Sequence, residues 1–130
     1  MRRFAFCLAL LTAAACDLGS IFGPDDVRYI DRRPMNPVPP EYAELYAATE
    51  LCLGMSGNFG AVQFFVADEI VMDGHRKAGT LKFPNDLTMW EHLMLTPWAV
   101  GHEFSHHITG IGDALHDELG GVPCQNAGAH

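Results

Sequence analysis

Two stretches of the chain carry apolar residues at the spacing of an α-helix. In residues 41–53 the positions that recur at helical spacing are Tyr42, Leu45, Tyr46, Thr49 and Cys52 or Leu53. In residues 97–109 they are Val100, Phe104 and Ile108, four residues apart on one face. Gly54 follows the first stretch, Pro97 opens the second, and Gly110 follows it, as expected at helix ends. We therefore predict helices over residues 41–53 and 97–109.

Between these helices the pattern is that of short strands. Apolar, β-branched and aromatic residues favour strands at 61–66, 69–72 and 79–83, with Asp73-Gly74 as a turn. Residues 85–96 are ambiguous, and we expect a helical segment at Leu87–Leu95. The order of elements predicts an α+β fold, with an N-terminal helix, a small antiparallel sheet and a second helix packed on it.

The first 40 residues lack this periodicity and have a different composition. Arg2 and Arg3 precede an apolar run that ends in small residues before Cys16, which is typical of a secretory signal peptide over residues 1–15. The run is too short for a permanent membrane span, which needs roughly 20 apolar residues. Residues 17–40 are rich in proline, so we expect residues 16–40 to be an extended tether and residues 41–130 to be the folded domain.

The residues before Cys16 resemble the lipobox of bacterial lipoproteins, in which the cysteine is lipidated after cleavage. Ala13 departs from the leucine usual at that position. The resemblance implies an exported protein of the bacterial cell envelope, bound to the membrane through a lipid on Cys16. Secretion, or release into the periplasm, is the alternative. Lipid chains on one cysteine would anchor the chain, because each buried methylene adds about 0.8 kcal/mol.

The charge and the cysteines narrow the possibilities further. The formal net charge is −8 and no basic cluster occurs, so the chain is unsuited to binding nucleic acid. Cys7 lies in the signal peptide and Cys16 is the lipidation candidate, which leaves Cys52 and Cys124 to form a disulfide in an oxidising compartment. Closing that loop of about 70 residues could stabilise a small domain by roughly 3–4 kcal/mol. The alternative is that one of these cysteines is a metal ligand.

The second predicted helix contains the sequence His102-Glu103-Phe104-Ser105-His106. Residues four apart share a helix face, so His102 and His106 can present two imidazoles to one metal ion. Glu103 is adjacent and can reach water on that ion. The motif resembles the HExxH of zincin metallopeptidases, which implies zinc as cofactor and Glu103 as general base on the zinc-bound water. An amphipathic helix with exposed histidines is the alternative.

A third zinc ligand is expected after the Gly110–Gly112 turn. His116 is the preferred candidate, and Asp113 and Glu118 are the alternatives. The arrangement resembles that of metzincins, but His116 lies ten residues after His106, where metzincins have six. Glu118 is the nearest match to the glutamate of gluzincins. His107 should point about 100° away from His106 and is not expected to bind the metal.

Residues 42–124 are also similar to a group of small bacterial exported proteins. Thr49-Glu50-Leu51-Cys52, the histidine motif and Cys124 carry this resemblance, which implies a minimal zincin-like domain with a disulfide. Residues 79–83 are a candidate for the edge strand that pairs with extended peptides in zincins, or else an ordinary hairpin strand. We expect a monomeric zinc metallopeptidase acting on a peptide or protein. The alternative is a non-catalytic envelope lipoprotein with a structural or vestigial zinc site.

Overall fold

A computed structural model describes residues 27–112, 115–116 and 122–128 of the 130-residue chain. The elements in order are β1 (Val27–Ile30), β2 (Arg33–Pro34), α2 (Glu41–Leu53), η1 (Phe59–Ala61), β3 (Gln63–Ala67), β4 (Glu69–Met72), β5 (His75–Arg76), β6 (Gly79–Lys82), β7 (Asp86–Trp90), η2 (Glu91–Leu93) and α3 (Pro97–Thr109). The predicted α+β fold is confirmed, and both helices have the predicted bounds. Gly54 and Gly110 end them in the left-handed conformation.

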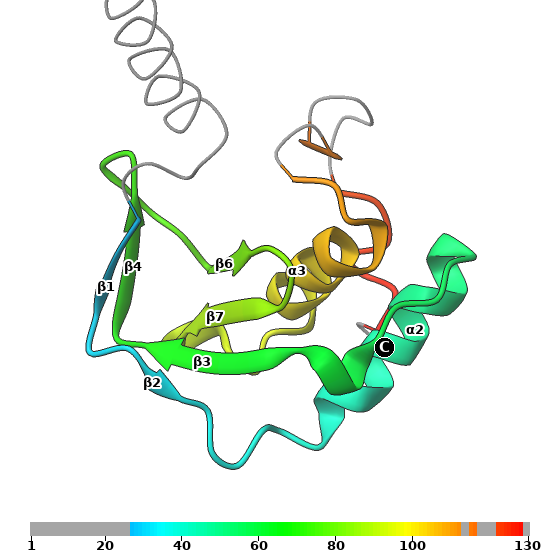
Figure 1. The fold of residues 1–130 in the computed structure, drawn as a ribbon, viewed down its shortest axis with the longest axis horizontal. Coiled ribbons are helices and arrows are strands. Elements are labelled where there is room, and N and C mark those ends of the chain that lie inside the picture. Colours follow the sequence, from blue (N-terminus) through cyan, green and yellow to red (C-terminus); the bar gives the residue numbers. More distant parts are fainter. Residues whose placement is uncertain (1–26, 113–114, 117–121, 129–130) are drawn as a thin grey trace, which may run out of the picture.

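The strands form two sheets (Figure 1). The smaller sheet has the order β1-β4-β5 and is antiparallel. The larger has the order β2-β3-β7-β6, with β6 at one edge. The β3–β7 pair is parallel, so the larger sheet is mixed, while the smaller sheet is the small antiparallel sheet of the expected fold. A parallel pair needs a long connection, which here contains β4, β5 and β6.

The helical segment expected at Leu87–Leu95 is wrong. Residues 86–90 form strand β7, and only a single 3-10 turn, η2, follows. Strand β7 lies between β3 and β6, and its residues 87–89 are fully buried on both faces. A strand buried on both sides has a continuous apolar run instead of an alternating one, so periodicity cannot distinguish it from a buried helix.

Part of the stretch expected to be a tether, residues 16–40, belongs to the sheets and the core. Residues 27–30 pair with β4, residues 33–34 pair with β3, and Met35 is buried in the core. The prolines suggested an extended linker, but a short strand at the edge of a sheet tolerates proline. The partners lie more than 30 residues further along the chain, so the local sequence does not reveal them. The predicted signal peptide and the predicted lipidation site, Cys16, lie outside the described residues.

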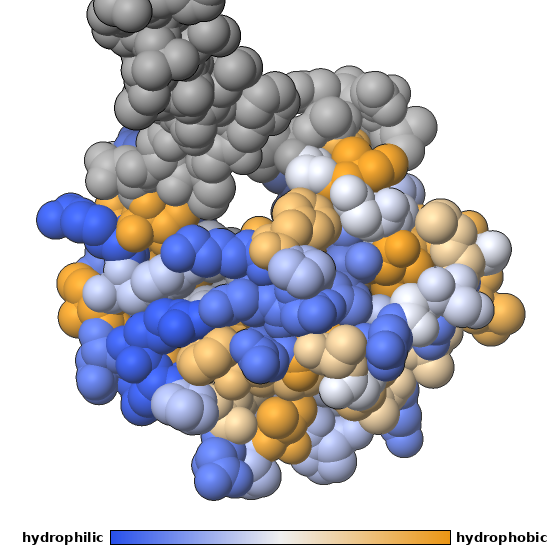
Figure 2. Space-filling view, in the orientation of Figure 1, coloured by the Kyte–Doolittle hydropathy of each residue, from blue (hydrophilic) through white to orange (hydrophobic). Residues whose placement is uncertain are grey.

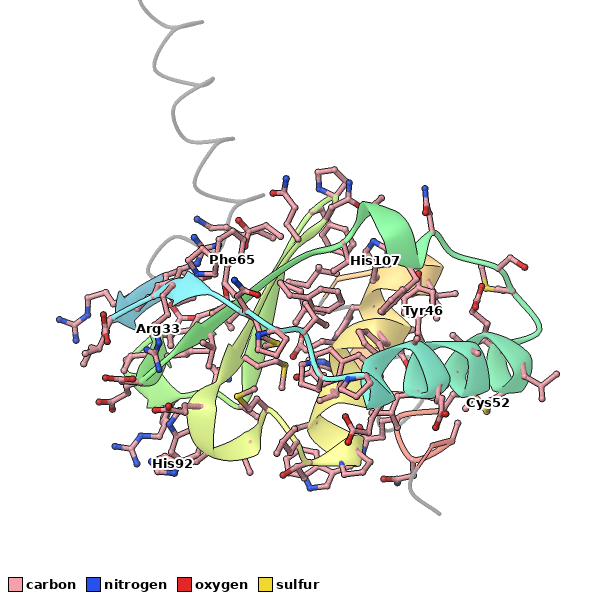
Figure 3. All side chains as sticks on the ribbon, turned by 90° about the horizontal axis from the view of Figure 1, so that it is seen from below. Arg33, Tyr46, Cys52, Phe65, His92 and His107 are labelled. Atoms are coloured by element: carbon pink, nitrogen blue, oxygen red, sulfur yellow. A yellow bond between two sulfur atoms is a disulfide. The ribbon has the colours of Figure 1, made fainter. Side chains whose placement is uncertain are left out.

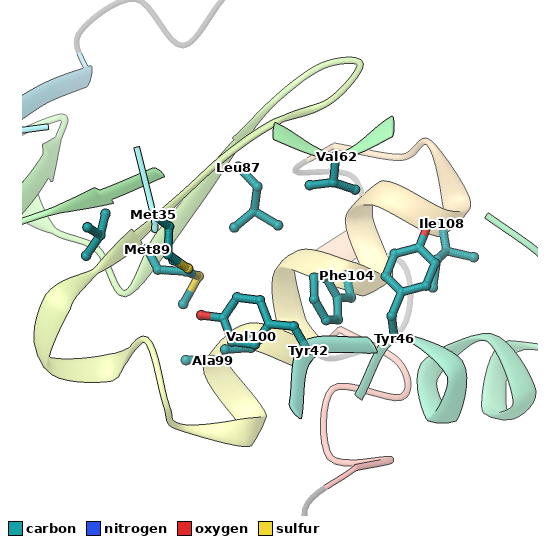
Figure 4. Close-up of a cluster of buried hydrophobic side chains, with 11 residues drawn as sticks. Met35, Tyr42, Tyr46, Val62, Leu87, Met89, Ala99, Val100, Phe104 and Ile108 are labelled. Carbon is teal, nitrogen blue, oxygen red and sulfur yellow. The ribbon is translucent and has the colours of Figure 1, made fainter. Parts of the chain in front are cut away.

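The core lies where α2 and α3 pack against the larger sheet (Figure 4). Tyr42 and Tyr46 of α2 and Phe104 of α3 are at most 1% exposed, and their rings meet edge to face. Leu87 and Met89 of β7 complete this core from the sheet side. The back of α3 is therefore held firmly, and the positions of its other side chains are fixed relative to the sheet.

The opposite face of the larger sheet is polar. The guanidinium of Arg32 stacks 3.6 Å from the ring centre of Phe65 and donates a hydrogen bond to Thr88. Figure 2 shows hydrophilic residues gathered over the strands, and Figure 3 shows Phe65 far from Tyr46 and His107, which lie at the two helices. Within the described part of the chain, no helix is both long and apolar enough to cross a bilayer.

Candidate metal centre

The histidine motif lies in the last three turns of α3. Val100, Phe104 and Ile108 are 0%, 0% and 7% exposed and hold the back of the helix in the core. His102 and His106 lie on another face, four residues apart, as the spacing predicted. His106 is buried and His102 is half-buried. The core packing of α3 therefore determines where both imidazoles point.

A third histidine completes the group. Nε2 of His106 lies 3.2 Å from Nε2 of His102 and 2.9 Å from Nε2 of His116. Nε2 of His116 is 3.0 Å from Nε2 of His102. Three nitrogens bound tetrahedrally at about 2.0–2.1 Å from zinc would lie about 3.3 Å apart, so only small shifts separate the observed triangle from that arrangement. The three side chains are close enough to bind one metal ion.

The hydrogen bonds on the far sides of the rings set the tautomers of two of them. Nδ1 of His106 lies 2.8 Å from the carbonyl oxygen of Ile111, and Nδ1 of His102 lies 3.1 Å from Oε1 of Gln125. Both oxygens accept, so both Nδ1 atoms carry a hydrogen. In the neutral rings Nε2 then has a lone pair. Two lone pairs facing each other at 3.2 Å repel, and a cation between them removes the repulsion.

The electrostatics of His102 favour its neutral form. Burial lowers the pKa of His102, and the neighbouring His106, His116 and Lys77 lower it further, while the hydrogen bond to Gln125 opposes this. A metal ligand must be neutral imidazole, so the surroundings favour the binding form. His116 is exposed, so the group opens to solvent on that side.

The side chain of Glu103 lies between α3, which carries it, and the edge of the larger sheet. Its side chain is 6% exposed, and a Cβ placed on Gly79 would come within 3.0 Å of its Cγ. The same Cβ would come within 2.8 Å of the sulfur of Met89. The absence of a side chain at Gly79 therefore makes room for Glu103 beside β6. Among the described strands β6 pairs with β7 alone, so residues 79–82 of the candidate segment 79–83 form an edge strand.

The structure brings together His102, His106 and His116. Asp113 and Glu118 lie outside the described residues. His107 is turned away, as expected: its Nε2 lies 3.0 Å from Oδ1 of Asn85 and its Nδ1 2.8 Å from the hydroxyl of Tyr46. The predicted Cys52–Cys124 disulfide is confirmed, so neither cysteine is a metal ligand.

Three contributors to the site were missed from the sequence. Gln125 and the carbonyl of Ile111 orient the histidines, and Lys77, two residues before Gly79, acts on His102 through its charge. Gln125 directly follows Cys124, so its place next to the predicted disulfide was the one feature of the sequence that could have pointed to it. The other two depend on where loops meet α3, which spacing along the chain does not reveal.

Comparisons of the chain with protein-family models, with curated proteins and with solved structures found no match. The geometry of the three histidines and Glu103 is therefore the basis for assigning a function.

Proposed function

We propose that this chain is an exported, membrane-anchored zinc peptidase, in which His102, His106 and His116 hold zinc and Glu103 is the general base. The observation that carries the proposal is the convergence of three Nε2 atoms within 3.2 Å of one another, two of them from α3, the helix that also bears the buried Glu103. The signal peptide and the lipidated Cys16 remain inferences from the sequence of the first 16 residues.

The donor set supports zinc as the metal. Three neutral imidazoles suit zinc, whereas calcium and magnesium prefer oxygen ligands. Three protein ligands on a tetrahedral ion also leave one position for water or substrate. When bound, zinc supplies Lewis-acid activation of a carbonyl group and of water. The exposure of His116 supports access to this side of the group.

Glu103 and β6 supply the remaining parts of the proposed reaction. An extended peptide added at the outer edge of β6 would be held by backbone hydrogen bonds next to Glu103. The carboxylate of Glu103 takes a proton from the attacking water and returns it to the leaving amine nitrogen as the peptide bond breaks. Lys77 lies on the chain just before β6 and contributes positive charge near His102.

The test compares wild type with Glu103→Gln, using the mature chain, a library of unstructured peptides and mass-spectrometric detection of cleavage. We expect Glu103→Gln to bind zinc as wild type does and to cleave at least about 100-fold more slowly, since general-base catalysis contributes about 10²–10⁴-fold. Glu44→Gln, an exposed change on α2, is the matched control and should cleave as wild type does.

Equal cleavage by wild type and Glu103→Gln would refute the role of Glu103. Zinc binding by wild type without cleavage of any peptide would favour the non-catalytic lipoprotein with a structural or vestigial zinc site. Failure to bind zinc would reject both functions.

A further inference from the structure

The segment after the third histidine, residues 122–128, packs along α3. Val122 is 7% exposed, and the carbonyl of Pro123 accepts a hydrogen bond of 2.7 Å from the hydroxyl of Ser105. A Cβ on Gly101 would collide with the carbonyl oxygen of Gln125. The segment thus lies in direct contact with the helix that carries His102 and His106, at the turn that includes His102.

The disulfide ties this segment to the other helix. Cys124 is bonded to Cys52 in the last turn of α2, and Gln125 is the next residue. The side chain of Gln125 then reaches Nδ1 of His102 at 3.1 Å. A single covalent link therefore lies one residue away from the group that fixes the orientation and tautomer of a metal-binding histidine.

Holding that group in place has a chemical consequence at the metal. An acceptor at Nδ1 keeps the hydrogen there, so that Nε2 presents its lone pair, and it raises the basicity of the ring. Without the acceptor His102 can turn or change tautomer, and either change removes one nitrogen from the converging group. Loss of such a partner typically lowers metal affinity about 10–100-fold.

We propose that Gln125 is a positioning residue for the metal centre and that the Cys52–Cys124 disulfide sets metal affinity by holding Gln125 against His102. The inference rests on the metal site of the proposed function and does not depend on peptide cleavage. Reduction by a dithiol transfers two electrons and two protons, which gives two thiols and oxidises the dithiol to its own disulfide. The reduced chain binds zinc more weakly than the oxidised chain.

The experiment measures zinc affinity by competition with a chromophoric chelator, on the full chain without its signal peptide. Gln125→Ala lowers the affinity about 10–100-fold. Gln125→Glu keeps an oxygen acceptor and restores wild-type affinity or better. Asn126→Ala, an exposed change at the neighbouring residue, is the matched control and leaves the affinity within about 2-fold of wild type.

The role of the disulfide is tested with the double variant Cys52→Ser and Cys124→Ser, and with wild type reduced by a dithiol. Both bind zinc more weakly by a factor similar to that of Gln125→Ala. Adding Gln125→Ala to the double variant lowers the affinity little further, because the two changes act through one contact. Thermal unfolding of each metal-free protein shows whether it is folded. If the double variant unfolds, wild type and the Gln125 variants in the oxidised state still decide the role of Gln125.

Four results would overturn the proposal. Unchanged affinity in Gln125→Ala removes the positioning role, and so does equal weakening by Gln125→Ala and Gln125→Glu. A folded double variant with wild-type affinity removes the role of the disulfide. If wild type binds no zinc the inference falls with the metal site, whereas zinc binding without peptidase activity leaves it intact.

Discussion

His106 and His107 are neighbours on α3, yet the structure gives them opposite environments. Nε2 of His106 faces two other histidine nitrogens, while its Nδ1 is directed at a backbone carbonyl. Both nitrogens of His107 have protein partners, Tyr46 and Asn85. Burial lowers the pKa of His107, which favours a neutral ring. Because Oδ1 of Asn85 can only accept, the hydrogen is on Nε2, and the lone pair on Nδ1 accepts from the hydroxyl of Tyr46.

Hydrogen-bond partners therefore decide which of these two histidines can bind a metal. On one side of α3 the Nε2 atoms of His102, His106 and His116 point at one another, an arrangement that suits a shared cation. On the other side both nitrogens of His107 are satisfied. Tyr46 links α3 to α2 (Figure 3), and Asn85 links α3 to the residue before β7. Changing the two histidines separately should therefore affect two different properties, metal affinity and stability.

The largest effect is expected on the metal side. His106→Ala removes one of three converging nitrogens and should lower zinc affinity by at least about 100-fold, more than loss of a partner behind a ligand costs. Because His106 is also buried, thermal unfolding of the metal-free variant should be measured alongside the chelator competition. A folded variant that retains wild-type zinc affinity would contradict the assignment of His106.

An intermediate effect, on stability, is expected from changing His107 on the other side of α3. His107→Ala should lower the free energy of unfolding by about 1–3 kcal/mol, because the largely buried hydroxyl of Tyr46 loses its hydrogen bond with His107. Zinc affinity should stay within about 3-fold of wild type. Denaturant unfolding and zinc titration of this variant check both statements, and a large loss of zinc affinity would show that His107 takes part in the metal centre.

The smallest effect concerns alkaline pH. Burial raises the pKa of Tyr46 to about 12 in the folded chain, above the ordinary value of about 10. A raised folded pKa stabilises the native state fully below pH 10, and this contribution is lost as the pH rises through 10 towards 12. Tyr46→Phe should therefore show a smaller fall in melting temperature between about pH 9 and about pH 11 than wild type. An equal fall would show that ionisation of Tyr46 does not contribute.

Much of the fold followed from the local sequence, because its determinants lie within one element. Pro97 and Gly110 set the ends of α3, and Asp73-Gly74 forms the predicted turn between β4 and β5, both residues having positive φ. Strand β7 was mistaken for a helix, and β1 and β2 for a linker. Each of these depends on pairing with strands distant in sequence, and local periodicity carries no information about such partners.

In the candidate site, too, some features follow from the local sequence and others depend on tertiary structure. Spacing alone placed His102 and His106 on one helix face, because positions four apart are neighbours on any α-helix. No known zincin spacing supports His116 over Asp113 and Glu118, and only the tertiary structure brings its Nε2 to within 3.0 Å of the other two.

The sequence by itself determined the two helices, the shared face of His102 and His106, and the pairing of Cys52 with Cys124. Tertiary structure alone decided that Gln125 meets His102, that Tyr46 meets His107 and that Glu103 lies against Gly79. The physical reason is the range of the interactions. Helix periodicity acts over a few residues, whereas these contacts join segments that meet only once the core between α2, α3 and the sheet has formed.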